Sequence, residues 1–442
     1  MDPEIGLFLS NAPYGRRHGF PDGKRGRVAQ PMILVLSGIV TALILAELIL
    51  RLLGVSYPSF YTADEHTGFT LRPYSRGWWH NEGQAFIRIN SQGFRDREHA
   101  QAKPLNTLRI AILGDSYGEA LQVDMNQTFW TIIERELRDC QAVRGRTVEV
   151  MNFSVSGYGT AQELLTWRYR AKGYAPDIVI LAFLTGNDVR NNIRALEQDP
   201  LRPYFIHRQG QLVLDHSFRD TIGFRLRDSL LMGLYRKLRD RFRVLQVVGE
   251  AHHAIQTYRE QSRQSRGRMA TWQKKAEIHL DEMVYRAPLD PVWQEAWQVT
   301  EELIMLLHRE VTAEGATLLL VTLSNGIQVH PDARVRQDAM TRLGVDGLFY
   351  PDLRLKALGE REGIPVLNLA PSFQRYAEQH HAFLHGFGSH RGYGHWNADG
   401  HRLAGEMIAQ QLCAGLLAET SEEAAIRKTH QAPQLLDRNA KD

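Results

Sequence analysis

The chain has 442 residues, of which 43% are hydrophobic and 23% are charged, and its formal net charge is +3. This length and composition suit one large globular domain with additional segments. The small net charge argues against a nucleic-acid binder or a polybasic surface binder, and the sequence contains no zinc-finger spacing or glycine-rich phosphate loop. We expect no cofactor.

The N-terminal part predicts a membrane anchor. Residues 1–31, rich in Gly, Pro and Arg, are predicted to be disordered, and a 19-residue apolar run at 32–50 is broken only by Glu47. As a helix this run spans roughly 28 Å, which is enough to cross the hydrocarbon core of a bilayer. We therefore predict a transmembrane anchor at 32–53, in which Glu47 and Arg51 lie four residues apart and can pair.

The charges that flank the anchor predict its orientation. Five Lys and Arg residues lie at positions 16–27, whereas residues 52–71 contain none. By the positive-inside rule, the N-terminus stays in the cytoplasm and the remainder faces outward, in a periplasm or outside the cell. A cleaved signal peptide is the competing interpretation, but the basic leader is long and no small-x-small cleavage site precedes Tyr57.

The region after the anchor predicts an α/β domain. Residues 54–105 form a polar, aromatic-bearing lead-in segment, residues 106–420 form the main domain, and 421–442 form a disordered tail. Short apolar runs predict buried strands, at 108–113, 148–153, 177–184, 317–323 and 364–369. Helical periodicity fits the segments between and after them, at 127–140, 161–172, 293–312, 353–362 and 399–417. This alternation predicts a three-layer domain with a five-stranded parallel sheet.

A polar and basic segment at 190–290 interrupts this pattern after the third strand. Loops that follow parallel strands leave the carboxyl edge of the sheet, so we interpret the segment as a helical insertion that acts as a lid. Within it, residues 224–242 carry apolar side chains every four positions and predict one amphipathic helix. Its apolar side is expected to pack on the domain itself; contact with a membrane is the alternative.

The two cysteines, Cys140 and Cys413, are each predicted to lie near the end of a helix. In an exported protein they can form a disulfide if the first and last helices of the domain lie side by side. Two reduced core cysteines are the alternative.

Four segments supply the parts of an acyl-transfer site. Ser116 follows the first strand, Gly157 the second and Asn187 the third, while His395 precedes the last helix. Acyl transfer needs a nucleophile, a base and donors directed at the oxyanion. A hydroxyl, an imidazole, a glycine N–H and an asparagine amide provide these parts. Taken alone, Asp-Ser before a helix is also an ordinary N-terminal cap.

These segments resemble the four signature blocks of the SGNH/GDSL hydrolases. GDSYGEALQVDMNQTF is similar to the first block, SGYGT to the second, GND to the third and HWNADGH to the last. The resemblance covers roughly residues 108–190 and 290–417. It implies a flavodoxin-like fold, Ser116 as nucleophile and His395 as base. It also implies an oxyanion hole made by the N–H groups of Ser116 and Gly157 and the side chain of Asn187, and substrates that are lipids, thioesters or acylated carbohydrates.

One position departs from the family pattern. The family normally carries an aspartate three residues before the histidine, where this chain has Gly392. The third member of the triad is therefore unknown. A backbone carbonyl in the loop GFGSHRGYGH can orient His395 and leave a Ser-His dyad; Glu378 is a distant candidate acid, and Asp399 suits a helix N-terminus for structural reasons alone. Loss of activity is the third possibility.

Other polar residues receive structural interpretations. Six histidines lie between 380 and 401, but no carboxylate or cysteine with the spacing of a known metal site accompanies them, and we predict no metal. His401 is expected to pack or to form hydrogen bonds. Asp115 and Asp188 are expected to hold the turns that present Ser116 and Asn187.

The sequence therefore predicts a membrane-anchored serine esterase that removes an acyl or acetyl group from an exported lipid or carbohydrate. An O-acyltransferase that modifies an exported polysaccharide shares this chemistry and is the first alternative, with envelope polysaccharide machinery as its partner. A non-catalytic glycan-binding or assembly protein with the same fold is the second.

Overall fold

The computed structural model describes residues 25–264 and 280–418. The chain divides into two compact units, Met1–Val55 and Ser56–Asp442. Most of the N-terminal segment predicted to be disordered, 1–24, and the whole predicted tail, 421–442, lie outside the described residues.

The first unit contains one long helix, α1 (Arg25–Leu52). It begins seven residues before the predicted anchor and includes Pro31. The stretch Pro31–Leu52 is long and apolar enough to cross a membrane, and none of it is buried within the protein. A membrane anchor and a signal sequence both meet this description. The predicted pair forms, since Nε of Arg51 donates to Oε1 of Glu47 at 2.7 Å.

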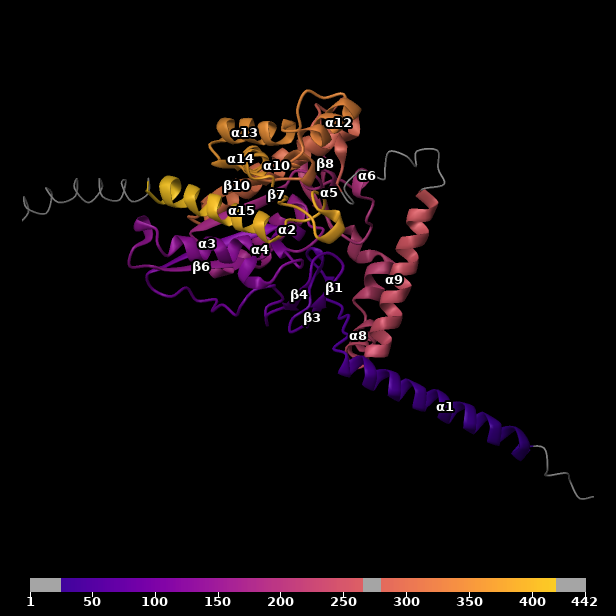
Figure 1. The fold of residues 1–442 in the computed structure, drawn as a ribbon. Helices are drawn as coiled ribbons and strands as arrows, with labels where there is room; N and C mark the ends of the chain where they lie inside the picture. Colours follow the sequence, from indigo (N-terminus) through magenta and orange to yellow (C-terminus); the bar gives the residue numbers. More distant parts are fainter. Residues whose placement is uncertain (1–24, 265–279, 419–442) are drawn as a thin grey trace, which may run out of the picture. The chain divides into compact units, whose positions relative to one another are not determined.

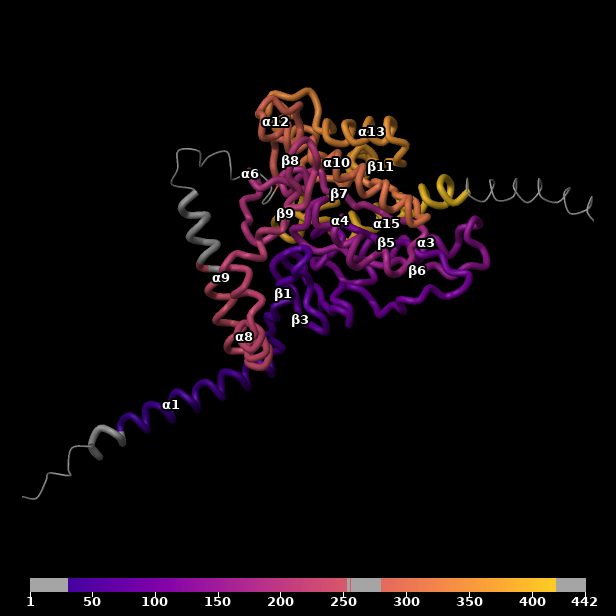
Figure 2. Tube along the Cα trace, turned by 180° about the vertical axis from the view of Figure 1, so that it is seen from behind, coloured from indigo at the N-terminus to yellow at the C-terminus, as the bar shows by residue number. Residues whose placement is uncertain are grey.

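The second unit is built on a five-stranded parallel sheet (Figure 1). Its strands are β5 (Thr107–Gly114), β6 (Thr147–Asn152), β7 (Ile178–Leu184), β10 (Thr317–Leu323) and β11 (Val366–Asn368). They confirm the five predicted strands, and every strand end agrees with its prediction to within two residues. The order across the sheet is β11-β10-β7-β5-β6, which is the flavodoxin-like arrangement. Figure 2 shows the same sheet from behind.

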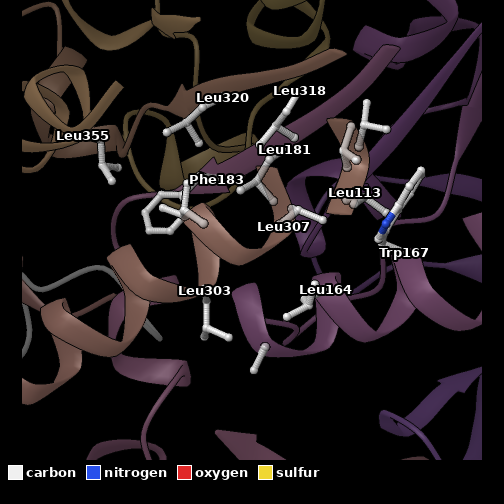
Figure 3. Packing of buried hydrophobic residues seen from close by; sticks show 14 of the residues in the cluster. Leu113, Leu164, Trp167, Leu181, Phe183, Leu303, Leu307, Leu318, Leu320 and Leu355 are labelled. Carbon is white, nitrogen blue, oxygen red and sulfur yellow. The ribbon is translucent and has the colours of Figure 1, made fainter. Parts of the chain in front are cut away.

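Helices cover both faces of the sheet, because side chains alternate along each strand and every strand is apolar on both sides. One face packs against α4 (Thr160–Tyr169), α10 (Pro291–Ala313) and α13 (Tyr350–Glu362), as Figure 3 shows for Leu164, Leu303 and Leu307 opposite Leu181 and Leu318. The other face packs against α3 (Phe129–Leu137), α14 (Ala370–His380) and α15 (Ala398–Gln411). The predicted three-layer fold is confirmed; α14 and α12 (Ala333–Leu343) were not predicted.

The lead-in segment is folded as part of the second unit. It forms two antiparallel hairpins, β1 (Tyr61–Asp64) with β2 (Gly68–Leu71) and β3 (Arg76–Trp79) with β4 (Ala85–Arg88). Their buried side chains form a small core of their own with three residues of the main domain. This core contains Phe60, Leu71, Ala85, Ile87, Ile89, Leu121, Val155 and Tyr158. The boundary predicted near residue 105 therefore does not separate the segment from the domain.

The insertion contains strands as well as helices. In order it forms α5 (Asp188–Asn191), α6 (Arg194–Glu197), β8 (Tyr204–Arg208), β9 (Gln211–Asp215), α7 (Ile222–Arg227), α8 (Leu230–Arg241) and α9 (Arg243–Gln264). The prediction of one helix over 224–242 was wrong, because Ser229 starts a new helix: its Oγ accepts the N–H of Met232 at 3.2 Å. Residues 265–279 lie outside the described part, and the lid remains a prediction.

Cys140 and Cys413 form a disulfide with a Cα–Cα distance of 5.9 Å. Cys140 follows α3, and Cys413 lies in the π-helical turn Leu412–Leu416 that follows α15. Because α3 and α15 pack on the same face of the sheet, their C-terminal ends meet and the two thiols come into bonding range.

Candidate active site

The sheet order brings three of the predicted site segments together. β5 lies between β6 and β7, and all three strands are parallel, so the loops after them leave the same edge side by side. Ser116 comes two residues after β5, Gly157 five residues after β6, and Asn187 three residues after β7.

Ser116 lies within hydrogen-bond range of the predicted base. The distance from Ser116 Oγ to His395 Nε2 is 2.9 Å. On the other side of the ring, His395 Nδ1 lies 2.5 Å from Oε2 of Glu82. The three side chains form a Ser–His–Glu relay, in which Glu82 accepts from Nδ1–H and Nε2 faces the serine hydroxyl as the acceptor of its proton.

Glu82 is the acid that the sequence left unknown. It lies in the turn between β3 and β4, where its carbonyl accepts the indole N–H of Trp79 at 3.1 Å. Its Oε1 accepts the backbone N–H of His395 at 2.8 Å, so one carboxylate fixes both the ring and the main chain of that residue. Gly394 is required beside it: its φ is +84°, and a Cβ there would lie 2.2 Å from Glu82 Oε1.

The candidates named from the sequence have other roles. The carbonyl of Gly394 accepts from His385 Nδ1 at 2.7 Å rather than from His395. Glu378 pairs with Arg336. Asp399 lies in the first turn of α15, as expected for a helix N-terminus.

Gly392, which stands where the family has an aspartate, has no room for a side chain. Its φ is +94°, and a Cβ would lie 2.6 Å from Cδ2 of His330. Glu82 reaches His395 from the opposite end of the chain, 313 residues earlier, and no spacing rule connects the two.

Electrostatics keep Glu82 ionised. Burial alone would raise the pKa of its carboxyl group, but the hydrogen bonds from His395 and the positive charge that this ring can carry outweigh burial and lower the pKa below its usual value. An ionised carboxylate only accepts hydrogen bonds, so it holds the proton of the neutral imidazole on Nδ1.

Ser116 is held by its neighbours on both sides. Oδ1 of Asp115 accepts the N–H of Tyr117 at 2.9 Å and caps the short helix α2 (Ser116–Glu119), so the N-terminal cap is Asp115 and Ser116 is the first helical residue. At the other end, the buried guanidinium of Arg95 donates to the carbonyl of Glu119 at 2.7 Å. The lead-in segment thus fixes the serine as well as supplying Glu82.

Asn187 and Gly157 have the properties of oxyanion donors. Asn187 is 8% exposed, and its Nδ2 donates one hydrogen to Oδ2 of Asp115 at 3.2 Å, which leaves the second hydrogen of the amide for a ligand. Gly157 has a φ of +79°, and its carbonyl accepts from Arg202 at 2.8 Å. Its N–H has no partner among the described residues. Their catalytic roles, and that of the Ser116 N–H, remain predictions.

Replacing Asn187 with alanine is expected to lower kcat about 100- to 1000-fold with little change in KM, because an oxyanion donor acts mainly in the transition state. Steady-state kinetics with 4-nitrophenyl acetate measures both constants. Asn81→Ala, an exposed change in the β3–β4 turn, is the matched control. A loss in KM alone would contradict the role.

Buried acids lie beneath these loops. Oδ2 of Asp188 accepts the N–H of Leu184 at 2.8 Å, which closes the turn that presents Asn187. Burial raises the pKa of Asp188 well above its usual value, and the neighbouring carboxyl groups of Glu163 and Asp115 raise it further. Burial likewise raises the pKa of Asp115, although the hydrogen bonds from Tyr117 and Asn187 oppose it. The geometry supports the expected structural roles of Asp115 and Asp188.

Two of the clustered histidines are buried. Burial lowers the pKa of His385 to about 4 and that of His401 to about 3, so both are neutral at physiological pH. The ring of His401 stacks on Phe129 with a centroid distance of 6.1 Å. In the part of the chain that the structure describes, no three His, Cys, Asp or Glu residues are grouped to hold a metal ion.

No protein-family model matches this chain, and no curated protein matches it. Among solved structures, the acetyl xylan esterase AlAXEase is 11% identical, with a TM-score of 0.34 over 68% of this chain and 98% of its own. A catalytic mutant of an acetylxylan esterase from Geobacillus stearothermophilus is 11% identical, with a TM-score of 0.34 over 70% and 94%. A putative lipolytic protein of the G-D-S-L family from Desulfitobacterium hafniense DCB-2 is 10% identical, with a TM-score of 0.32 over 68% and 98%.

At these identities and TM-scores the likeness says nothing of activity. The chain has a flavodoxin-like sheet whose edge carries Ser116, Gly157 and Asn187, and the Ser116 hydroxyl lies 2.9 Å from His395 Nε2. In fold and in the layout of this site, the chain resembles the SGNH/GDSL hydrolases.

Proposed function

We propose that this protein is a serine esterase that removes an acyl or acetyl group through an acyl-enzyme intermediate. The observation that carries the proposal is the continuous relay from Ser116 Oγ through the ring of His395 to the carboxylate of Glu82. A serine hydroxyl is a weak nucleophile by itself, and an adjacent oriented imidazole is the usual means of activating it.

The relay supports the following sequence of steps. Ser116 Oγ attacks the ester carbonyl carbon while its proton moves to His395 Nε2, and Glu82 stabilises the imidazolium without taking the proton. The oxyanion receives hydrogen bonds from Asn187 and the N–H groups of Gly157 and Ser116. The carbon–oxygen ester bond breaks, and Nε2 returns the proton to the leaving alkoxide. Water then attacks the carbonyl carbon of the acyl-serine while His395 Nε2 takes its proton. The bond between that carbon and Ser116 Oγ breaks, the carboxylic acid leaves, and Nε2 returns the proton to Ser116 Oγ.

The proposed substrate is an exported lipid or carbohydrate. α1 has the length and composition of a membrane span, and the basic residues that precede it favour a cytoplasmic N-terminus with the catalytic unit outside. The disulfide between Cys140 and Cys413 suits an oxidising compartment such as the periplasm.

Transfer to a sugar hydroxyl is the alternative within the same chemistry, since an acceptor alcohol can replace water in the second half of the reaction. The non-catalytic alternative depended on Gly392, and the position of Glu82 beside His395 supports a catalytic site instead.

A fluorophosphonate probe tests the nucleophile. Purified full-length protein is expected to be labelled at Ser116 only, because the hydroxyl must be activated to react; peptide mapping locates the label. Product analysis with 4-nitrophenyl acetate as the acyl donor, with and without an unacetylated polysaccharide acceptor, then separates the two reactions. Release of free acid at the same rate with and without acceptor supports hydrolysis, whereas formation of acylated acceptor supports transfer. Folded protein that takes no label contradicts both.

A further inference from the structure

The helices α8 and α9 leave an unusual number of apolar side chains uncovered. On α8 and just after it these are Leu230, Leu231, Leu234, Tyr235, Leu238 and Phe242, with exposed fractions from 45% to 94%. We call these six residues the apolar face. Both views show α8 and α9 side by side at the margin of the domain, away from the sheet (Figures 1 and 2). Single exposed leucines are ordinary, but a continuous row marks a contact surface.

The apolar face is one side of a helix. Residues 230, 234, 238 and 242 recur every fourth position and therefore lie along one stripe, and Leu231 and Tyr235 widen it. α9 adds Leu245 and Val248, which are 38% and 60% exposed. The prediction that this stripe packs on the domain itself is wrong, because its side chains are exposed.

The charge around this face is strongly positive. Residues 222–243 contain seven Lys and Arg residues and two Asp residues. One of the two, Asp240, is already neutralised by Arg72, whose Nη2 donates to its Oδ1 at 3.0 Å. A helix with an apolar side and basic flanks is typical of segments that lie in the interface of an anionic bilayer.

The turn between α8 and α9 is tied to the start of the second unit. The backbone N–H of Tyr57 donates to Oε1 of Gln246 at 2.8 Å, and Nε2 of Gln246 donates to the carbonyl of Arg239 at 3.0 Å. The side chain of Gln246 is buried. Ser56 follows the last residue of α1, Leu52, by four residues, and four residues of extended chain span about 14 Å. Covalent connection therefore keeps this turn near the membrane that holds α1.

We propose that α8 and α9 lie on the outer surface of that membrane, with the apolar face at the headgroup boundary and the basic residues on the phosphates of anionic lipids. The occupant of the apolar face is thus a lipid surface. The proposal depends on the retention of α1 in the bilayer and is independent of the chemistry of Ser116. A second, shallow contact beside the anchor restricts how the catalytic unit can turn relative to the bilayer.

Depth-dependent quenching tests this contact in the full-length protein. Leu234→Cys supplies one reactive thiol, because both native cysteines are in the disulfide. An environment-sensitive fluorophore at this position, in single-copy nanodiscs of phosphatidylglycerol and phosphatidylcholine, is expected to shift to the blue and to be quenched several-fold by headgroup-labelled lipid. The matched control is Leu353→Cys on α13, where the native leucine is similarly exposed at 62%; its label is expected to show neither effect.

Four further measurements decide between the outcomes. A label at Ile39→Cys in α1 is expected to be quenched by lipids labelled deep in the acyl chains. In phosphatidylcholine alone, or with Arg227→Glu and Lys237→Glu together, quenching at position 234 is expected to fall at least twofold. The proposal is overturned if position 234 stays unquenched while position 39 is quenched, or if position 39 itself is unquenched. The last measurement uses nanodiscs that hold two copies of the protein. If the label at position 234 shifts to the blue only in these discs, the proposal is overturned and the apolar face is assigned to contact with a second chain.

Discussion

Replacing Ser116 with alanine is expected to lower kcat for ester hydrolysis about 10⁶-fold, because the acyl-enzyme cannot form without the hydroxyl and the rest of the relay then has nothing to activate. The hydroxyl lies 2.9 Å from His395 Nε2 and has no other strong partner among the described residues. The measurement is steady-state release of 4-nitrophenol from 4-nitrophenyl acetate by full-length protein, together with the loss of fluorophosphonate labelling.

The control for this change is Ser389→Ala, which removes the same hydroxyl from an exposed position in the loop that leads to His395. It is expected to keep wild-type turnover. A Ser116→Ala variant that retains more than about one hundredth of the wild-type kcat would show that the serine is not the nucleophile.

Glu82→Gln is expected to lower kcat about 10⁴-fold, which is the loss seen when the aspartate of a serine-protease triad becomes an amide. Glutamine keeps the size of the side chain but can donate a hydrogen bond, so the ring of His395 can take the tautomer with its proton on Nε2 and can no longer accept from Ser116. Because the KM for a small ester depends little on this ring, the loss should fall on kcat.

Glu65→Gln is the matched control, since Glu65 is 71% exposed in the turn of the neighbouring hairpin. Thermal unfolding of both variants separates a catalytic loss from a folding defect. Equal kcat for wild type and a folded Glu82→Gln variant would mean that a Ser–His dyad is sufficient.

The lowered pKa of Glu82 also predicts how this variant's stability depends on pH. A carboxyl group whose folded pKa is depressed stabilises the fold above its unfolded pKa, and this contribution disappears as the pH falls through the folded value. Glu82→Gln should therefore be less stable than wild type near pH 7, and the difference should shrink as the pH falls below about 4.3, the usual value for glutamate. A difference that grows on acidification would contradict the direction of the shift.

Much of the fold was predictable because its signals are local. Five apolar runs, each followed by helical periodicity, are enough to indicate a parallel sheet covered on both faces, and the structure has that sheet. The placement of Ser116, Gly157 and Asn187 at one edge follows from the same pattern, since parallel strands end on the same side. The predicted long helix is interrupted at Ser229, because the side chain of this serine caps a new helix. The sequence pattern did not show the interruption, because the four-residue apolar repeat continues through both helices.

The sequence by itself determined which residues follow the strands, where the apolar helix lies and that a histidine precedes the last helix. These properties depend only on residues that are close to one another in the sequence. The tertiary structure alone decided what orients His395. Glu82 belongs to a hairpin in a segment without catalytic motifs, and it reaches the ring only because that hairpin packs on the domain through Ala85 and Ile87 and because Gly394 leaves space for a carboxylate. Contacts made across 313 residues leave no pattern in a single sequence.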